Sequence, residues 1–181
     1  MIKLLAGAFV GGILLFAWQT LSWMMLDLHG KEYQYTPNQE SVMQYLNSQF
    51  TSEGQYLLPN VGKDASMEEH DAMRKSMEGK PWALISYHKA YDSNMMTMII
   101  RGFLACFVAA LFVCWVLMKN TRSTFFSTFI SCILIGLAAY LFFPYTGIIW
   151  FKNPGADTFL IDAVASWGLC GLWLGWWLNR K

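Results

Sequence analysis

The chain consists of long apolar runs and one polar stretch. Four runs of about 20 or more residues are almost free of charged side chains. They cover approximately Leu4–Leu26, Met95–Met118, Thr124–Phe143 and Thr158–Leu178. Since a helix needs about 20 apolar residues to cross the hydrocarbon core of a bilayer, the pattern predicts an all-α integral membrane protein with four transmembrane helices.

The polar stretch between the first two runs is too long for a simple connection. Asn38 precedes a helical pattern over Gln39–Gln49, and Ala65–Glu78 repeats apolar residues at helical spacing. Gln55–Leu58 and Trp82–Tyr87 have the composition of short strands. We therefore expect a small α+β insert between the first and second helices.

These segments predict three parts: transmembrane helix 1 over residues 1–29, the insert over 30–93, and transmembrane helices 2–4 over 94–181. Charged residues make up 14% of the chain and apolar residues 55%, whereas a soluble domain carries about 25% charged residues. The formal net charge of +1 leaves no basic surface for phosphates and excludes nucleic acid as a partner. The lipid bilayer is the first expected partner.

The basic residues of the short connections and of the two ends predict the topology. With four spans, the N-terminus, the second connection and the C-terminus share one side of the membrane. That side carries Lys3, Lys119, Arg122, Arg180 and Lys181. Short basic segments remain in the cytoplasm, so we expect cytoplasmic termini and an extracytoplasmic insert.

Small residues at four-residue spacing indicate helix contacts. Gly7 and Gly11 lie in the first run, and Gly171 and Gly175 in the last. Lipid provides no hydrophobic drive for helix pairing, so close backbone approach at small residues matters. The spacing fits both packing within the chain and contacts in an oligomer.

Three ionisable residues lie in or at the spans and define a polar outer layer: Asp27, Arg101 and Asp162. Ionisable groups inside a span are costly and face protein, each other or water. Arg101 and Asp162 lie at similar depth on antiparallel spans, which predicts a pair. The layer is either structural or a site for an anion, a lipid headgroup or a proton-linked step.

Sulfur and imidazole groups form a second candidate site. His29, His88, Met95 and Met98 flank the outer ends of the first two spans, and such ligands suit Cu(I). Methionines also fill gaps in apolar cores, so we interpret the cluster as packing, and we expect no metal and no cofactor. The four cysteines lie in apolar runs without CxxC spacing, which indicates packing as well.

Several short motifs carry a resemblance. They are Gly11-Gly12-Ile13, Trp18, Ser22-Trp23, His29 and Leu57-Leu58-Pro59. With these motifs the chain resembles a group of small bacterial four-pass inner-membrane proteins over most of its length. The resemblance implies bacterial origin, an inner-membrane location and the same topology. It implies no activity.

The sequence contains no Ser-His-Asp set, glycine-rich phosphate loop or metalloprotease helix motif. It therefore favours a non-enzymatic protein, an accessory or assembly subunit that docks to a larger membrane complex. Its protein partner would be another membrane protein or a second copy of the chain. The alternative is a membrane protein that handles a small molecule, an ion or copper through the polar outer layer.

Overall fold

A computed structural model describes residues 1–180 of the chain. It consists of two compact units: a helical unit, formed by Met1–Gln34 and the chain from Asn94 onward, and the insert, Tyr35–Ser93. The helical unit contains these elements: α1 (Ile2–Thr20), the π-helical turn η1 (Leu21–Met25), the 3-10 turn η2 (Gly30–Glu32), α4 (Met95–Leu117), α5 (Phe125–Phe142), α6 (Pro144–Phe151) and α7 (Ala156–Asn179). The residues just before Tyr35 belong to the helical unit, although the sequence predicts an insert from residue 30.

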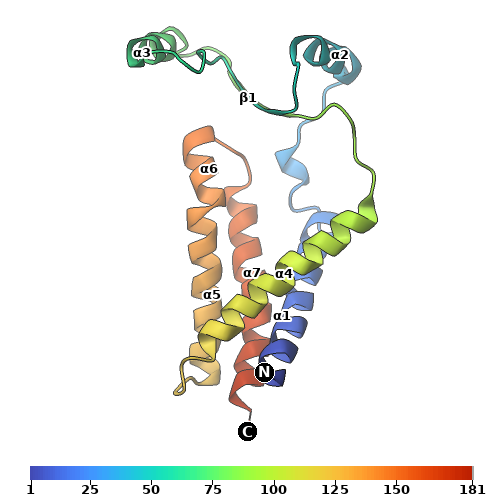
Figure 1. The fold of residues 1–181 in the computed structure, drawn as a ribbon, viewed down its shortest axis with the longest axis vertical. Helices are drawn as coiled ribbons and strands as arrows, with labels where there is room; N and C mark the ends of the chain where they lie inside the picture. Colours follow the sequence, from blue (N-terminus) through green and yellow to red (C-terminus); the bar gives the residue numbers. More distant parts are fainter. Residues whose placement is uncertain (181) are drawn as a thin grey trace. The chain divides into compact units, whose positions relative to one another are not determined.

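Four helical stretches are long and apolar enough to cross a membrane, which confirms the four predicted long helices. They are Ile2–Met25, Met95–Leu117, Phe125–Phe151 and Ala156–Asn179. The third stretch joins α5 and α6, and Pro144 begins α6, where the missing proline N–H would have no helical partner in any case. Both chain ends and the connection from α4 to α5 lie at one end of the helical unit (Figure 1).

The helices pack in the order α5, α7, α1 and α4, so that α7 and α1 form the centre of the row. In Figure 1, α4 runs diagonally across α1. The core includes Leu15, Ala110 and Leu174. All four cysteines are free and buried, as apolar packing residues are.

Glycines lie at the closest helix contacts. A Cβ added to Gly7 would lie 2.9 Å from the Trp177 ring, and one added to Gly171 would lie 2.9 Å from Cys132 Cβ. At Gly11 the nearest atom would be Cys170 Sγ, and at Gly175 the Phe125 carbonyl oxygen. All four predicted packing glycines therefore face neighbouring helices of the same chain.

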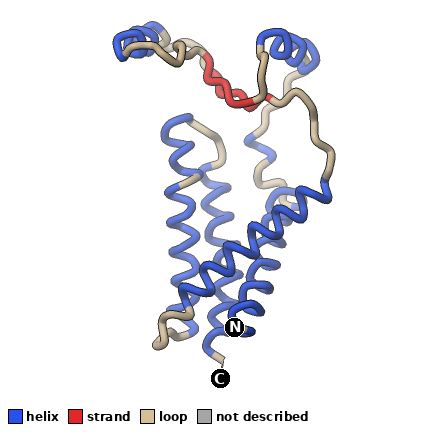
Figure 2. The backbone as a smooth tube through the Cα atoms, in the orientation of Figure 1, coloured by secondary structure: helices blue, strands red, loops and turns tan. Residues whose placement is uncertain are grey.

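The insert contains two helices and two strands, as predicted: α2 (Gln39–Gln49), β1 (Gly54–Leu58), α3 (Met67–Ser76) and β2 (Ala83–Tyr87). The strands form an antiparallel hairpin with Tyr56 opposite Ile85, and α2 and α3 lie at opposite ends of it (Figure 2). Phe50 stacks on Tyr56 and meets Tyr87 edge to face. This aromatic group is the small core of the insert.

Helix α3 begins at a capping box, in which Ser66 and Glu69 accept hydrogen bonds from each other's backbone N–H. Hydrogen bonding of the Glu69 carboxylate to the backbone N–H of Ser66, and to a lesser extent to the Ser66 side chain, holds the pKa of this carboxyl below its ordinary value. The helix is otherwise exposed and contains no buried residue. Its boundaries therefore depend on local hydrogen bonding and not on burial.

Candidate functional site

The carboxylate of Asp162, in the second turn of α7, is the centre of a buried polar cluster. Its Oδ1 accepts hydrogen bonds from Trp18 Nε1 at 2.9 Å and from Ser22 Oγ at 2.7 Å. Its Oδ2 lies 2.9 Å from His29 Nε2. One side chain of α7 thereby holds α1, η1 and the segment that follows them.

His29 occupies the middle of this cluster with only 1% of its surface exposed. Its second ring nitrogen, Nδ1, lies 2.8 Å from Glu32 Oε1. The Trp23 ring stacks on the imidazole with a centroid distance of 3.8 Å and an interplanar angle of 7°. Phe159 meets the imidazole edge-on. We call the set Trp18, Ser22, Trp23, His29, Glu32 and Asp162 the His29 cluster.

A wide turn at the end of the first span brings His29 back onto α7. The Leu26 N–H donates to the Leu21 carbonyl across the π-helical turn, and the Leu28 N–H donates to Ser22. Asp27 then adopts a left-handed backbone conformation with φ 46°. A Cβ on Gly30 would collide with the Asp27 carboxylate, so a larger residue at that position requires the exposed Asp27 side chain to move.

The same segment is anchored to the beginning of α7 by further contacts. The Thr158 hydroxyl donates to the Leu28 carbonyl at 3.3 Å, and Lys31 forms an exposed ion pair with Asp157. The Glu32 carboxylate lies against Gly155, whose φ of 93° is left-handed and whose missing side chain leaves room for it. Glu32 is thus held at the N-terminus of α7 with 7% of its side chain exposed.

The structure does not bring the predicted polar outer layer together. Asp162 belongs to the His29 cluster, whereas Asp27 is exposed. Arg101 is exposed on α4 and makes no ion pair with any residue of 1–180. The predicted pair of Arg101 and Asp162 is therefore wrong. Equal depth does not make two residues neighbours, and the Asp162 carboxylate faces Trp18, Ser22 and His29 instead.

The four candidate copper ligands have different surroundings. Both ring nitrogens of His29 face carboxylates, and His88 follows β2 in the insert, 3.4 Å from Ser86 Oγ. Met95 and Met98 are exposed on α4. Among the described residues, no group of three or more histidine, cysteine or acidic side chains is arranged to hold a metal ion.

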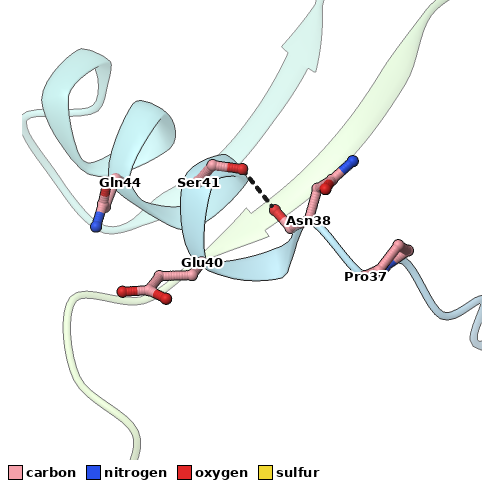
Figure 3. Close-up of a pocket in the computed structure, with 5 residues that line it drawn as sticks. All are labelled: Pro37, Asn38, Glu40, Ser41 and Gln44. Atoms are coloured by element: carbon pink, nitrogen blue, oxygen red, sulfur yellow. Dashed lines mark hydrogen bonds between the residues drawn. The ribbon is translucent and has the colours of Figure 1, made fainter.

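A hollow in the insert lies at the first turns of α2 and is lined by Pro37, Asn38, Glu40, Ser41 and Gln44 (Figure 3). All five residues are exposed. The Ser41 hydroxyl donates back to the Asn38 carbonyl at 3.0 Å. No buried polar group points into this hollow among its lining residues, so it offers less chemistry than the His29 cluster.

The sequence does not identify Trp18, Ser22 and Glu32 as members of a site. Their spacing carries a weak signal, because Trp18 and Ser22 are four residues apart on one helix face and His29 and Glu32 are three apart. In residues 1–180, every buried side-chain nitrogen and oxygen atom has a hydrogen-bond partner. The cluster is therefore closed on itself, and it can hold chain segments together and carry protons. Comparison with protein-family models, curated proteins and solved structures found no match.

Proposed function

We propose that this chain is a non-enzymatic accessory or assembly subunit that docks to a larger complex in a bacterial inner membrane. The observation that carries the proposal is Arg101, an exposed cation on an apolar helix face without a partner in the described chain. The occupant that fits this face is a membrane helix of another protein with a carboxylate near the outer boundary of the bilayer.

Arg101 lies six residues after Met95, about 9 Å along the helix axis. Its neighbours on the exposed face of α4 are apolar, with Leu104 50% and Val108 40% exposed. An arginine in hydrocarbon costs about 2.5–3.5 kcal/mol at the centre of a span, and less where it reaches the headgroups. A carboxylate from a neighbouring helix would offset this cost and would select the partner.

The His29 cluster supports the accessory role over the handling of a small molecule or metal. A ligand site needs polar groups that are free to turn to the ligand. Asp162 instead accepts from Trp18 and Ser22 and faces His29, and all three lie in the same chain. The arrangement favours a contact within the chain over a ligand site.

The proposed orientation has both termini in the cytoplasm and the insert outside. The common end of the two termini in the helical unit supports this orientation (Figure 1), as do the basic residues at that end, among them Lys3 and Arg180. Reporter fusions after Lys181 and within Ser52–Lys63 test it. We expect opposite compartments, and the same compartment for both would contradict the topology.

Photo-cross-linking from Val108, followed by purification of the full chain in mild detergent, tests the docking face. We expect one membrane protein to be captured by the wild type and by Arg101→Lys. Arg101→Gln should reduce its recovery about tenfold, as loss of about 1.4 kcal/mol would. Met98→Leu, an apolar exchange one turn away on α4, is the matched control and should leave recovery unchanged.

Three outcomes would contradict the proposal. The first is equal capture with Arg101→Gln, since the cation would then have no part in docking. The second is cross-linking to lipid alone, which would make Arg101 a headgroup anchor. The third is a homogeneous protein with a stoichiometric metal or small molecule, which would favour the alternative function.

A further inference from the structure

In the His29 cluster the imidazole lies between two carboxylates. This arrangement determines how many protons the three groups hold together. Nδ1 lies 2.8 Å from Glu32 and Nε2 lies 2.9 Å from Asp162. Each of these contacts needs one hydrogen between nitrogen and oxygen, because two lone pairs at this distance repel. The assembled triad therefore holds two protons.

The surroundings indicate that both carboxylates are ionised. Asp162 also accepts from Trp18 and Ser22, and three donors on one carboxyl favour the anion. Glu32 lies against Gly155 at the N-terminus of α7, where the helix dipole favours negative charge. The two protons then belong to the imidazole ring of His29.

The aromatic neighbours of His29 agree with a charged ring. Trp23 covers one face of the imidazole in a parallel stack at 3.8 Å. The electron-rich face of an indole attracts a cation, and the attraction grows when water is excluded. His29 is 1% exposed, whereas Trp23 is 43% exposed, so the indole covers the imidazole and shields it from water.

We propose that Glu32, His29 and Asp162 form a proton-binding site. Its bound proton holds the segment His29–Gln34, which leads into the insert and is called the tether, against α7. The site carries one positive and two negative charges when it is occupied. Loss of the proton to solvent leaves one nitrogen lone pair facing a carboxylate, and that contact opens. Glu32 lies just before the insert, which begins at Tyr35, so opening releases the tether.

The groups around His29 define which charges act on it. Glu32 comes from η2 and Asp162 from α7, while η1 contributes the uncharged Trp23. The exposed pair of Lys31 and Asp157 joins the same two elements and balances its own charge. The tether is thus held by the triad inside and by a screened ion pair outside.

Nitrogen NMR of the ring tests the proton count directly. The chain has three histidines, so His70→Gln and His88→Gln leave His29 as the single labelled residue in the full-length protein. We expect two protonated ring nitrogens in the folded wild type and one in Glu32→Gln under the same conditions. A wild-type ring with one protonated nitrogen would overturn the proposal.

Two isosteric variants sharpen the test because each removes one of the two negative charges. With Glu32→Gln the ring needs only the proton on Nε2, which faces Asp162. With Asp162→Asn it needs only the proton on Nδ1, which faces Glu32. We expect these opposite tautomers. The same tautomer in both variants would contradict the triad, and Glu32→Gln alone decides the matter if Asp162→Asn does not fold.

Hydrogen exchange reports the release of the tether. The backbone N–H of Leu28 donates to the Ser22 carbonyl oxygen, and the backbone N–H of Glu32 donates to the His29 carbonyl oxygen. After correction for intrinsic exchange, we expect their protection to fall at least tenfold once base has removed the second ring proton, as the nitrogen spectrum reports. Glu32→Gln should keep its protection over the same titration, because it needs no second proton. Unchanged protection of the wild type after loss of that proton would overturn the proposal.

Discussion

The two ends of the contact between α1 and α7 use the same donor group on different acceptors. Near the chain termini, Trp173 and Trp177 donate their indole N–H to the backbone carbonyls of Gly7 and Lys3, at 2.9 and 2.7 Å. At the opposite end, Trp18 donates to the carboxylate of Asp162. A backbone carbonyl stays neutral at every pH, whereas a carboxylate brings a charge that neighbours must balance.

The two ends of the α1–α7 contact are therefore stabilised by different interactions. The neutral end depends on shape, since Gly7 leaves room for the Trp177 ring. The charged end depends on partners, since Asp162 and Glu32 need the ring of His29 between them. Mutations at the neutral end should therefore act through volume, and those at the charged end through unpaired charge.

The largest effect is expected from Asp162→Leu. It removes the acceptor of Trp18, Ser22 and Nε2 of His29, and removal of one partner of a buried pair costs about 3–5 kcal/mol. Reversible unfolding of the full chain in mixed micelles measures the free energy. Asp162→Asn also removes the charge but keeps an acceptor for Trp18 and Ser22, so it should lose less, and equal losses for the two variants would mean that these hydrogen bonds have no part here.

A smaller effect is expected from Gly171→Ala on the side of α7 that faces α5. The new Cβ would lie 2.9 Å from Cys132 Cβ and 3.1 Å from the Phe129 carbonyl oxygen, and overpacking of this kind costs about 1–3 kcal/mol. Gly168→Ala on the same helix is the matched control, since nothing lies within 4 Å of its Cβ position. It should be neutral or stabilising by up to about 1 kcal/mol. A similar loss for both would remove shape as the cause.

At the charged end, Gly155→Ala tests backbone conformation against packing. The left-handed φ of 93° costs a residue with a Cβ about 1–2 kcal/mol, and the added methyl would also push on the Glu32 carboxylate. The unfolding free energy measures the sum. Combination with Glu32→Ala should recover the packing part and leave the backbone part, and strictly additive losses would show that the two residues do not interact.

The smallest effect is expected from Trp173→Phe, which removes one neutral hydrogen bond to Gly7. Such bonds average about 0.6 kcal/mol in membrane proteins. The loss should be the same in the wild type and in a Glu32→Gln background, whereas the loss from Trp18→Phe should differ between these backgrounds, because Glu32→Gln removes one charge from the His29 cluster. A background-dependent effect of Trp173→Phe would erase the distinction between the two ends.

The long helices and the insert follow from the sequence because each depends on local periodicity. The helix over Gln39–Gln49 agrees with the structure at both ends, since the pattern that specifies it lies within the segment. The predicted partner of Asp162 was wrong because depth along a span says nothing about rotation around it. His29 reaches Asp162 only through the π-helical turn and the left-handed Asp27, and neither has a signature in hydrophobic periodicity.

The π-helical turn at Leu21–Met25 also bears on which changes of chain length the protein can tolerate. A turn of this kind holds one residue more than an α-helical turn, and each residue rotates the helix by about 100°. Because the wide turn absorbs that extra residue, deletion of a single residue there would restore the α-helix and keep the chain beyond it in phase with α7, whereas a deletion elsewhere in the helix would rotate that chain by about 100°. Among homologous genes, single-residue changes of length before His29 should therefore concentrate at Leu21–Met25 and be absent from the α-helical turns of α1 before it.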